Sequence, residues 1–354
     1  MRILYGVQAT GNGHITRART MAPALAAAGI EVDYLFSGRP HEELFSMEPF
    51  GDFRCLPGLT FAIKAGRIQY LNTALNNNMV RFIRDVRTLD LRPYDLVLTD
   101  FEPVTAWAAK IQKRPSVAIG HQYAFFHDIP KAKNNPLASA IIRFFAPGET
   151  QIGLHWDHFN LPILPPLIER PKLSATVERG SILIYLPFED TNEVIRLLEP
   201  FSNYRFQVYC ATEVRKEIGN ITLKPFSRET FQRDLACCEG VISNSGFELA
   251  SEALQYGKKI LVKPLKGQME QWSNAAALTQ LEMGTQMDDF YPEIITAWLR
   301  TPNPTPVLYP DVAATITNWI QTGRTDSVDS LSRMLWADLS PRYAPDADMI
   351  ASAE

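Results

Sequence analysis

The sequence predicts an α/β fold with two domains, because short apolar strands alternate with helical segments in two series along the chain. Its 354 residues suffice for about two domains of ordinary size. Hydrophobic residues make up 46% and charged residues 21% of the chain, so each half can bury a core. Alternating strands and helices are typical of a parallel sheet with helices on both faces. We therefore expect two doubly wound sheets that face each other across a cleft.

The first series lies in the N-terminal half. We expect its strands at 2–8, 30–36, 94–100 and 115–121, and its helices at about 13–28 and 103–113. Between them, apolar residues that include Ile68, Leu75 and Phe82 recur at three- and four-residue spacing. This periodicity predicts a long helix over 67–90.

A proline-rich stretch, LPILPPLIERPKL at 161–173, interrupts the pattern and predicts a stiff connection between domains. A second series follows, with strands expected at 181–187, 204–210, 221–226, 240–244 and 258–264 and helices at about 190–200, 228–238, 246–256 and 269–282. The expected division is an N-terminal domain at 1–165, a linker at 166–179, a C-terminal domain at 180–320, and a helix with a tail at 321–354.

Composition narrows the class of protein. The net charge of −4 disfavours a nucleic-acid partner, since such proteins are usually basic. No segment approaches the roughly 18 apolar residues of a membrane span, and the N-terminal MRILYGVQ is too short for a secretory signal. The four cysteines have no CxxC spacing, which indicates reduced thiols. We expect a cytoplasmic protein.

Ligands of open α/β sheets bind beyond the carboxyl ends of the strands. Two expected strand ends lie within the stretch ISNSGFELASEALQYGKKILVKPLKGQMEQWSNA at 242–275. The first of these strands ends at Asn244, and Ser245 and Gly246 then begin a helix, with Ser245 expected as the N-cap. Free N–H groups at a helix start bind anions such as phosphates. Glu252 lies six residues beyond Gly246, where its carboxylate can accept two hydrogen bonds from a diol such as ribose. The alternative is that this segment binds no ligand and is an ordinary capped helix with solvated carboxylates.

This stretch resembles the donor-binding segment of GT-B glycosyltransferases, in particular the peptidoglycan UDP-GlcNAc transferase and the plant UDP-glycosyltransferases. In those families a Gly at the helix start is followed six positions later by a Glu that binds the donor ribose, as Gly246 and Glu252 are here. An acidic residue or Gln, followed by Gln and then Asn-Ala, contacts the donor sugar, and EQWSNA at 270–275 is similar. The resemblance implies two Rossmann-like domains and donor-sugar contacts by Glu270 and Gln271.

Two departures from the family pattern concern the diphosphate. The family's Arg or His two positions before the helix Gly is Asn244 here, so a cation would have to come from Lys263 or Lys266. The glycine-rich turn after the first strand of the second domain is replaced by LPFED. The nucleotide of the donor therefore stays open, with a UDP-sugar favoured.

The loop GNGHITRA after the first strand resembles the turn that carries a cleft-facing His in these families, with Gly11 and Gly13 leaving room for substrate. Imidazole suits a general base near neutral pH, so His14 is the expected catalytic base. A base needs an orienting partner, and Asp100 is favoured over Glu102 for this role. The alternative for Asp100 is a helix cap ahead of a proline. His121, after the next strand, is a weaker candidate for the base or for acceptor binding.

Nicotinamide and metal sites are both disfavoured. The GNG turn lacks the third glycine of a dinucleotide fingerprint, and no acid follows the second strand. No DxD pattern is present as a metal–diphosphate clamp at a predicted strand end, and the aspartates of MDDF at 287–290 are expected to be solvated. His155 and His158 with Asp157 lack a further ligand for zinc. We expect neither a metal nor a cofactor other than the sugar donor itself.

The stretch 125–145 mixes basic side chains with apolar and aromatic ones, which fits either a membrane-facing surface or an ordinary packed helix and loop. The expected function is inverting, metal-independent transfer of a sugar from a nucleotide-sugar to a hydroxyl acceptor, for which a lipid-linked molecule and a glycan are the candidates. A nucleotide-sugar epimerase and a non-catalytic nucleotide-sugar-binding regulator are the alternatives.

Overall fold

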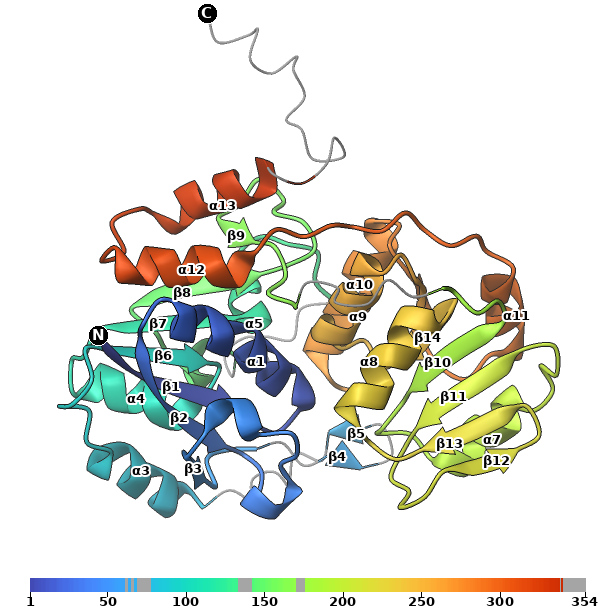
Figure 1. Cartoon of the computed structure of the whole chain (residues 1–354), viewed down its shortest axis with the longest axis horizontal. Helices are drawn as coiled ribbons and strands as arrows, with labels where there is room; N and C mark the ends of the chain where they lie inside the picture. The colour runs from blue at the N-terminus through green and yellow to red at the C-terminus, as the bar shows by residue number, and fades with distance from the viewer. Residues whose placement is uncertain are drawn as a thin grey trace, which may run out of the picture.

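The computed structural model describes residues 1–60, 63–64, 67–68, 78–132, 142–169, 176–337 and 339. These residues form two seven-stranded sheets and a two-stranded hairpin, with helices packed on the sheets (Figure 1). The predicted α/β class is confirmed. Within this part of the chain, the helices are too short or too polar to cross a membrane.

The first sheet is parallel throughout, in the order β3-β2-β1-β6-β7-β8-β9. Its strands are β1 Arg2–Gln8, β2 Glu31–Ser37, β3 Phe53–Leu56, β6 Leu96–Asp100, β7 Ser116–Gly120, β8 Thr150–Leu154 and β9 Ile163–Leu164. The inner strands β6 and β7 are buried along their whole length. Burial on both faces explains their near-continuous apolar sequences.

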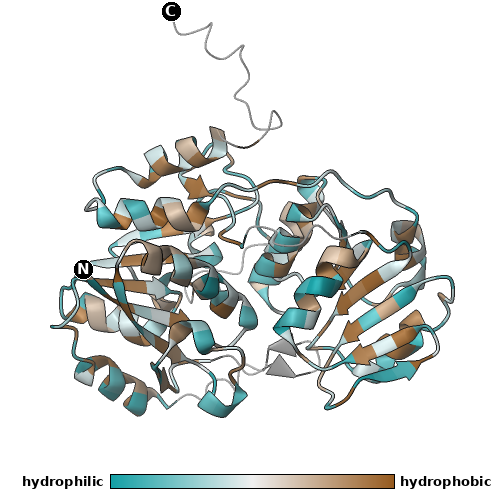
Figure 2. Ribbon diagram, in the orientation of Figure 1, coloured by the Kyte–Doolittle hydropathy of each residue, from teal (hydrophilic) through white to brown (hydrophobic). Residues whose placement is uncertain are grey.

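The second sheet has the order β12-β13-β11-β10-β14-β15-β16, and only the edge pair β12–β13 is antiparallel. Its strands are β10 Ser181–Tyr185, β11 Arg205–Tyr209, β12 Lys216–Ile218, β13 Ile221–Lys224, β14 Gly240–Ser243, β15 Lys259–Val262 and β16 Thr285–Gln286. Hydrophobic stretches run along inner strands of this sheet, whereas the edge strand β12 and the covering helices include hydrophilic residues (Figure 2).

The helices cover both sheets, as expected for parallel strands joined by crossovers. They are α1 Asn12–Ala27, α3 Met79–Thr88, α4 Pro103–Ile111, α5 His121–Ala124, α7 Thr191–Leu198, α8 Arg228–Cys237, α9 Phe247–Gln255, α10 Met269–Gln280, α11 Pro292–Leu299, α12 Val312–Gln321 and α13 Val328–Ala337, with short 3₁₀ turns at His41–Glu43 and Glu48–Phe50.

The last two helices return to the first sheet. Helix α12 packs on α1, and α13 packs on β9 (Figure 1). The indole Nε1 of Trp336 donates to the carbonyl of Ile163 at 2.7 Å, and the hydroxyl of Ser332 donates to the same carbonyl at 2.7 Å. Helices α12 and α13 are therefore attached to the N-terminal half of the structure.

Two expectations from the sequence need correction. The helix predicted over 67–90 spans only Met79–Thr88 among the described residues, and Asn78 caps it by accepting from the backbone N–H of Arg81. Arg67–Ile68 instead form β5, which pairs with β4 Ile63–Lys64; residues 69–77 lie outside the described residues. The apolar spacing that predicted the helix begins at Ile68, well before the helix starts at Met79, and Ile68 lies in a strand.

The proline-rich stretch 161–173 is not a connection along its whole length. Ile163–Leu164 add β9 to the edge of the first sheet, and Leu167 and Ile168 are buried. Residues 170–175 lie outside the described residues. Proline tolerates the edge position because one side of an edge strand needs no ladder hydrogen bonds.

The two halves are in contact through α1 and α9, near the carboxyl ends of their central strands (Figure 1). One hydrophobic cluster includes Val7 and Ile119 from the first sheet and Val241 and Val262 from the second. The indole Nε1 of Trp156 also donates to the hydroxyl of Ser251 on α9, at 2.8 Å. Candidate site residues from both halves therefore meet at one interface.

Candidate active site

His14 and Asp100 are in direct contact. Asp100 is the last residue of β6 and pairs in register with Val7 of β1. Shortly after Val7, strand β1 is followed by α1, which carries His14 in its first turn. Nδ1 of His14 lies 2.6 Å from Oδ1 of Asp100. The Asp100 side chain is fully buried, whereas the His14 side chain keeps 15% of its surface exposed. The orienting contact expected from the sequence is therefore present, and one edge of the imidazole is accessible to solvent.

Arg17, which the sequence analysis did not single out, completes this group. It is buried, and its Nε and Nη2 donate to Oδ2 and Oδ1 of Asp100 at 2.7 and 2.5 Å. Nη2 also lies 2.9 Å from Nδ1 of His14. The i, i+3 spacing of His14 and Arg17 on a predicted helix puts both on one face, and this was the available signal.

The pKa of Asp100 reflects two opposing causes. Burial raises it, but the positive charge of Arg17 and the contact with His14 outweigh burial, so the net pKa is lowered. Arg17 shows the matching effect: burial lowers its pKa, and Asp100 and Glu248 raise it above the ordinary value. Asp100 is therefore a carboxylate at neutral pH.

Glu248, the second residue of α9, approaches this group from the other domain. Its Oε1 accepts a hydrogen bond from Nη1 of Arg17. Its Oε2 is buried and has no partner among the described residues. Burial raises the pKa of Glu248 to about 8, against the lowering effect of Arg17. Like Arg17, this residue was missed in the sequence.

Glu102 has a structural role that separates it from Asp100. Its carboxylate accepts from the backbone N–H groups of Val104 and Thr105, at 2.8 and 2.6 Å, and so caps α4. The hydroxyls of Ser37 and Thr105 also donate to it, both at 2.6 Å. The cap ahead of the proline is thus Glu102, and Asp100 is left to contact His14.

Phe101, between these two acids, has a positive φ of 52°. Non-glycine residues rarely adopt this left-handed conformation, which costs about 1–3 kcal/mol and is common at functional sites. The bend sends Asp100 toward His14 and Glu102 toward α4. The Phe101 ring also lies parallel to the His14 imidazole, with centroids 6.3 Å apart.

The start of α9 differs in one respect from the expectation. The N-cap position is Gly246, without a side-chain cap, so Ser245 is not the N-cap. The reason is that the helix begins one residue later than predicted. Ser245 is fully buried, and its hydroxyl has no partner among the described residues. With no capping side chain, the first N–H groups of α9 are available to an anion.

Glu252 lies on the same helix and is buried. Its Oε2 accepts from Nε2 of Gln232 on α8, at 3.1 Å. Burial raises the pKa of Glu252 to about 7, although the Gln232 hydrogen bond and Arg228 lower it. The side chain thus faces polar neighbours from α8.

Glu270 and Gln271 occupy different environments at the start of α10. Both carboxylate oxygens of Glu270 accept from Nε2 of Gln122, at 3.1 and 3.2 Å, across the interface between the domains. Oε1 of Gln271 accepts from the backbone N–H of Leu265 at 2.9 Å. Gln122 follows β7, so Glu270 reaches the carboxyl edge of the first sheet.

His121 uses both ring nitrogens inside the protein. Nδ1 lies 2.8 Å from the carbonyl of Leu154, and Nε2 lies 2.6 Å from Oδ1 of Asn274. The ring stacks on Phe247 of α9, with centroids 4.0 Å apart. Burial lowers its pKa. These contacts join the domains and favour a structural role over a role as base.

The lysines considered for the diphosphate are already paired. Nζ of Lys263 lies 2.8 Å from Oε1 of Glu189, which the LPFED loop supplies. Nδ2 of Asn244 donates to the same oxygen at 3.2 Å. Lys266 pairs with Asp289 at 2.7 Å, and both are partly exposed. The loop that replaces the glycine-rich turn thus brings an acid to Lys263.

Several buried polar atoms near the interface have no partner within the described part of the chain. They belong to Gln122 Oε1, Ser243 Oγ, Asn244 Oδ1, Ser245 Oγ and Glu248 Oε2. Buried polar atoms are usually hydrogen-bonded, and a group of unpaired ones calls for water or a ligand. All five lie on residues that follow or end β7 and β14, or begin α9.

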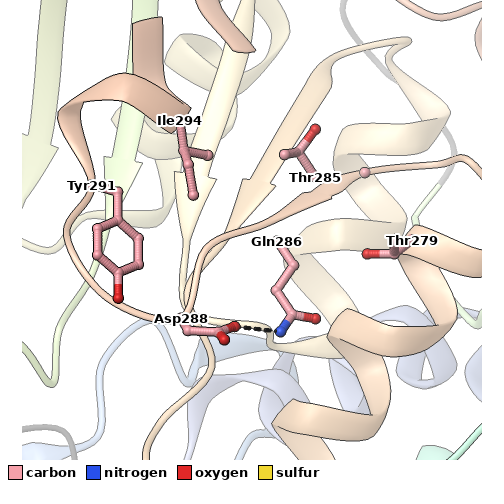
Figure 3. A pocket seen from close by; sticks show the side chains of 7 residues that line it. Thr279, Thr285, Gln286, Asp288, Tyr291 and Ile294 are labelled. Atoms are coloured by element: carbon pink, nitrogen blue, oxygen red, sulfur yellow. Dashed lines mark hydrogen bonds between the residues drawn. The ribbon is translucent and has the colours of Figure 1, made fainter. Parts of the chain in front are cut away.

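Other features lie away from this group. A hollow of about 430 Å³ lies beside the edge strand β16 (Figure 3). Its lining includes Gln286 of this strand and Asp288 and Tyr291, which follow it. Nε2 of Gln286 donates to Asp288 there, at 2.6 Å. In the residues that the structure describes, no three His, Cys, Asp or Glu side chains gather as a metal site would require.

Comparisons with known proteins agree with this architecture. The model of the family described as glycosyl transferase family 1 matches residues 1–302. No curated protein sequence matches the chain. Among solved structures, the glycotransferase of kitacinnamycin is 13% identical, with a TM-score of 0.59 over 96% of this chain and 99% of that one.

Two further structures have the same fold. The glycosyltransferase SnogD from Streptomyces nogalater is 17% identical, with a TM-score of 0.53 over 100% of this chain and 99% of its own. UGT89C1 from Arabidopsis thaliana, solved in complex with UDP, is 11% identical, with a TM-score of 0.56 over 94% and 99%. At these identities the likeness concerns the fold, and it confirms the predicted GT-B arrangement of two Rossmann-like domains.

Proposed function

The chain belongs to glycosyl transferase family 1, and we propose that it transfers a sugar from a nucleotide-sugar, favouring a UDP-sugar, to a hydroxyl acceptor with inversion at the anomeric carbon. The observation that carries this proposal is the contact between His14 and Asp100, 2.6 Å long, at the carboxyl edge of the first sheet.

In this mechanism Nε2 of His14 takes the proton of the acceptor hydroxyl. Asp100 holds Nδ1 and stabilises the imidazolium that forms. The acceptor oxygen then bonds to the anomeric carbon from the face opposite the nucleotide, and the bond from that carbon to the phosphate oxygen breaks. The nucleotide diphosphate leaves with the electron pair, so one displacement inverts the configuration. General-base catalysis of this kind contributes about 10²–10⁴ in rate.

The second domain supplies the donor side. The start of α9, directly after Ser245 and Gly246, would offer the first N–H groups of the helix to the diphosphate, and Gly13 lies opposite Glu248 of this helix. Glu252 would bind the ribose, and Glu270 and Gln271 the hydroxyls of the donor sugar. The plant relative solved with UDP supports a uridine nucleotide. The unpartnered polar atoms around this position support a polar ligand.

We propose that leaving-group charge is balanced by helix and side-chain groups and not by a metal, since the one DxD pattern of the sequence, at 346–348, comes after both series of predicted strands and not at a predicted strand end. The acceptor is a hydroxyl of a glycan or of a lipid-linked molecule at the cytoplasmic face of a membrane. Phe144, 62% exposed beside the exposed Arg143, supports contact with an anionic surface.

Incubation with a panel of nucleotide-sugars tests the proposal. Release of UDP, even by slow hydrolysis of the donor, is the expected result. Interconversion of the free donors would instead indicate the epimerase, and binding without turnover the regulator. Co-sedimentation with anionic vesicles tests the membrane contact, and protein left entirely in the supernatant would remove it.

A further inference from the structure

The guanidinium of Arg17 lies between two carboxyl groups that come from different domains. On one side it forms a two-point contact with Asp100, through Nε and Nη2. On the other side Nη1 donates to Glu248 of α9. Arg17 and Asp100 are 2% and 0% exposed, and Glu248 is 8% exposed, so the whole group is shielded from water.

The contact with Arg17 fixes the orientation of Asp100. A planar guanidinium that binds both oxygens of a carboxylate leaves the carboxylate little freedom to rotate. Oδ1, which faces His14, is therefore held in place by Arg17 and not by His14 alone. Any displacement of Arg17 must tilt Asp100 and change the direction in which the imidazole presents Nε2.

Glu248 fixes the other side of Arg17 only while the domains are docked. The side chain fits against Gly13, where a Cβ would come within 3.0 Å of its Cγ. Because Gly13 and Arg17 belong to α1 and Glu248 to α9, separation of these helices breaks the contact. Glu248 also lies in the first turn of α9, the helix whose start is proposed to receive the donor.

We propose that Arg17 and Glu248 form a latch through which docking of the second domain positions Asp100, and with it His14, for proton transfer. Both are positioning residues, and the inference rests on the proposed function. The latch makes the base competent when α9, with the donor at its start, is seated on α1. Nη1 of Arg17 loses its partner when the domains part, and the guanidinium is then held from the Asp100 side only.

The test compares Arg17→Met and Glu248→Leu with Glu248→Gln, whose amide oxygen can still accept from Arg17. Turnover with the UDP-sugar identified by the panel gives kcat and donor KM, calorimetry with UDP gives affinity, and thermal melting confirms folding. Ser251→Ala is the matched control, because it removes a different hydrogen bond between the domains from the same helix.

We expect kcat to fall about 10²-fold in Arg17→Met and about 10-fold in Glu248→Leu, the range expected for misplaced catalytic groups, with UDP affinity changed less than threefold. Glu248→Gln should recover most of the loss, and Ser251→Ala should keep kcat. The double variant Arg17→Met/Glu248→Leu should resemble Arg17→Met alone, because both act through one contact. Unchanged kcat in Glu248→Leu, or strictly additive losses, would overturn the latch.

A second measurement keeps the latch separate from the base. Amide hydrogen exchange in α1 and α9 reports docking without turnover, and Glu248→Leu should increase it while Ser251→Ala increases it less. If His14→Ala stays active but Glu248→Leu loosens α1 and α9, the assignment of the base fails and the contact between domains stands. If exchange is the same in Glu248→Leu and the parent protein, the latch fails whatever the role of His14.

Discussion

Nδ1 of His14 lies 2.6 Å from Oδ1 of Asp100, although 86 positions separate the two residues in the chain. Parallel pairing of β1 and β6 brings them together, because it places the ends of both strands at the same edge of the sheet. The imidazole is thereby oriented by a buried carboxylate while part of its surface remains open to solvent. This relationship is the basis for the first prediction.

Removal of the base should abolish transfer and spare donor binding. We expect His14→Ala to lower kcat by about 10²–10⁴, since this is the contribution of general-base catalysis. Asp100→Asn should lower kcat less, because the amide keeps a contact but carries no charge. UDP affinity, measured by calorimetry, should stay within threefold in both. A fully active His14→Ala would rule out His14 as the base.

The chain itself predicts much of this arrangement. Most inner strands of both sheets were predicted, because strands that are buried on both faces consist of apolar runs, whereas β3, β8, β12 and β16 were not predicted. Because parallel strands end at one edge of a sheet, the sequence also predicts that His14 lies near Asp100. The edge strand β9 was missed, because Ile163–Leu164 stand among prolines that suggest a connection.

The contacts between domains were not predictable in the same way. Arg17 and Glu248 are 231 positions apart, and they meet only because α1 and α9 dock in a particular orientation. No periodicity encodes that orientation. The preference of Ser for the N-cap position suggested Ser245, but the helix begins after Gly246, and the side chain of Ser245 is buried instead.

Glu252 should be required for donor affinity. If its carboxylate binds the ribose, Glu252→Ala will weaken UDP binding by about 10-fold or more, since a hydrogen bond to a charged group contributes about 1.5–3 kcal/mol. Glu239→Gln is the matched control, because Glu239 pairs with Lys259 at the opposite, amino-terminal edge of the sheet. Equal UDP affinity of Glu252→Ala and the parent protein would defeat the ribose assignment.

Stability should decline as the pH rises from about 4.5 to about 8. Burial raises the pKa of Glu248 from 4.5 to about 8, with Arg17, Asp100 and Glu252 as the charged neighbours. The folded protein then retains a proton that the unfolded chain has released. The stabilising contribution is complete below about pH 4.5 and is lost through about pH 8, at no more than about 1.4 kcal/mol per pH unit.

Chemical denaturation at pH 6, 7, 8 and 9 checks this dependence in the parent protein and in Glu248→Gln. The glutamine cannot ionise, so the variant should lose less stability between pH 7 and 9 and exceed the parent at pH 9. Glu252, with a pKa raised to about 7, adds a loss in the same direction to both proteins. Identical pH profiles for the two proteins would show that Glu248 does not hold the proton.

Two glycines of the first loop should respond differently to the same substitution. A Cβ at Gly13 meets Cγ of Glu248 at 3.0 Å, whereas a Cβ at Gly11 has no described atom within 4 Å. Serine is favoured over glycine inside a helix and also at an N-cap, so local preference alone would make both variants as stable as the parent or slightly more so. In Gly13→Ser the new Cβ should instead lower the stability, because the Glu248 side chain must shift away from Arg17 to make room for it. We expect kcat to fall about 3- to 10-fold and amide exchange in α9 to rise in Gly13→Ser, with Gly11→Ser unchanged in both. Equal amide exchange in the two variants would mean that a Cβ at Gly13 does not displace Glu248, and raised exchange with unchanged kcat would mean that Glu248 moves without consequence for catalysis.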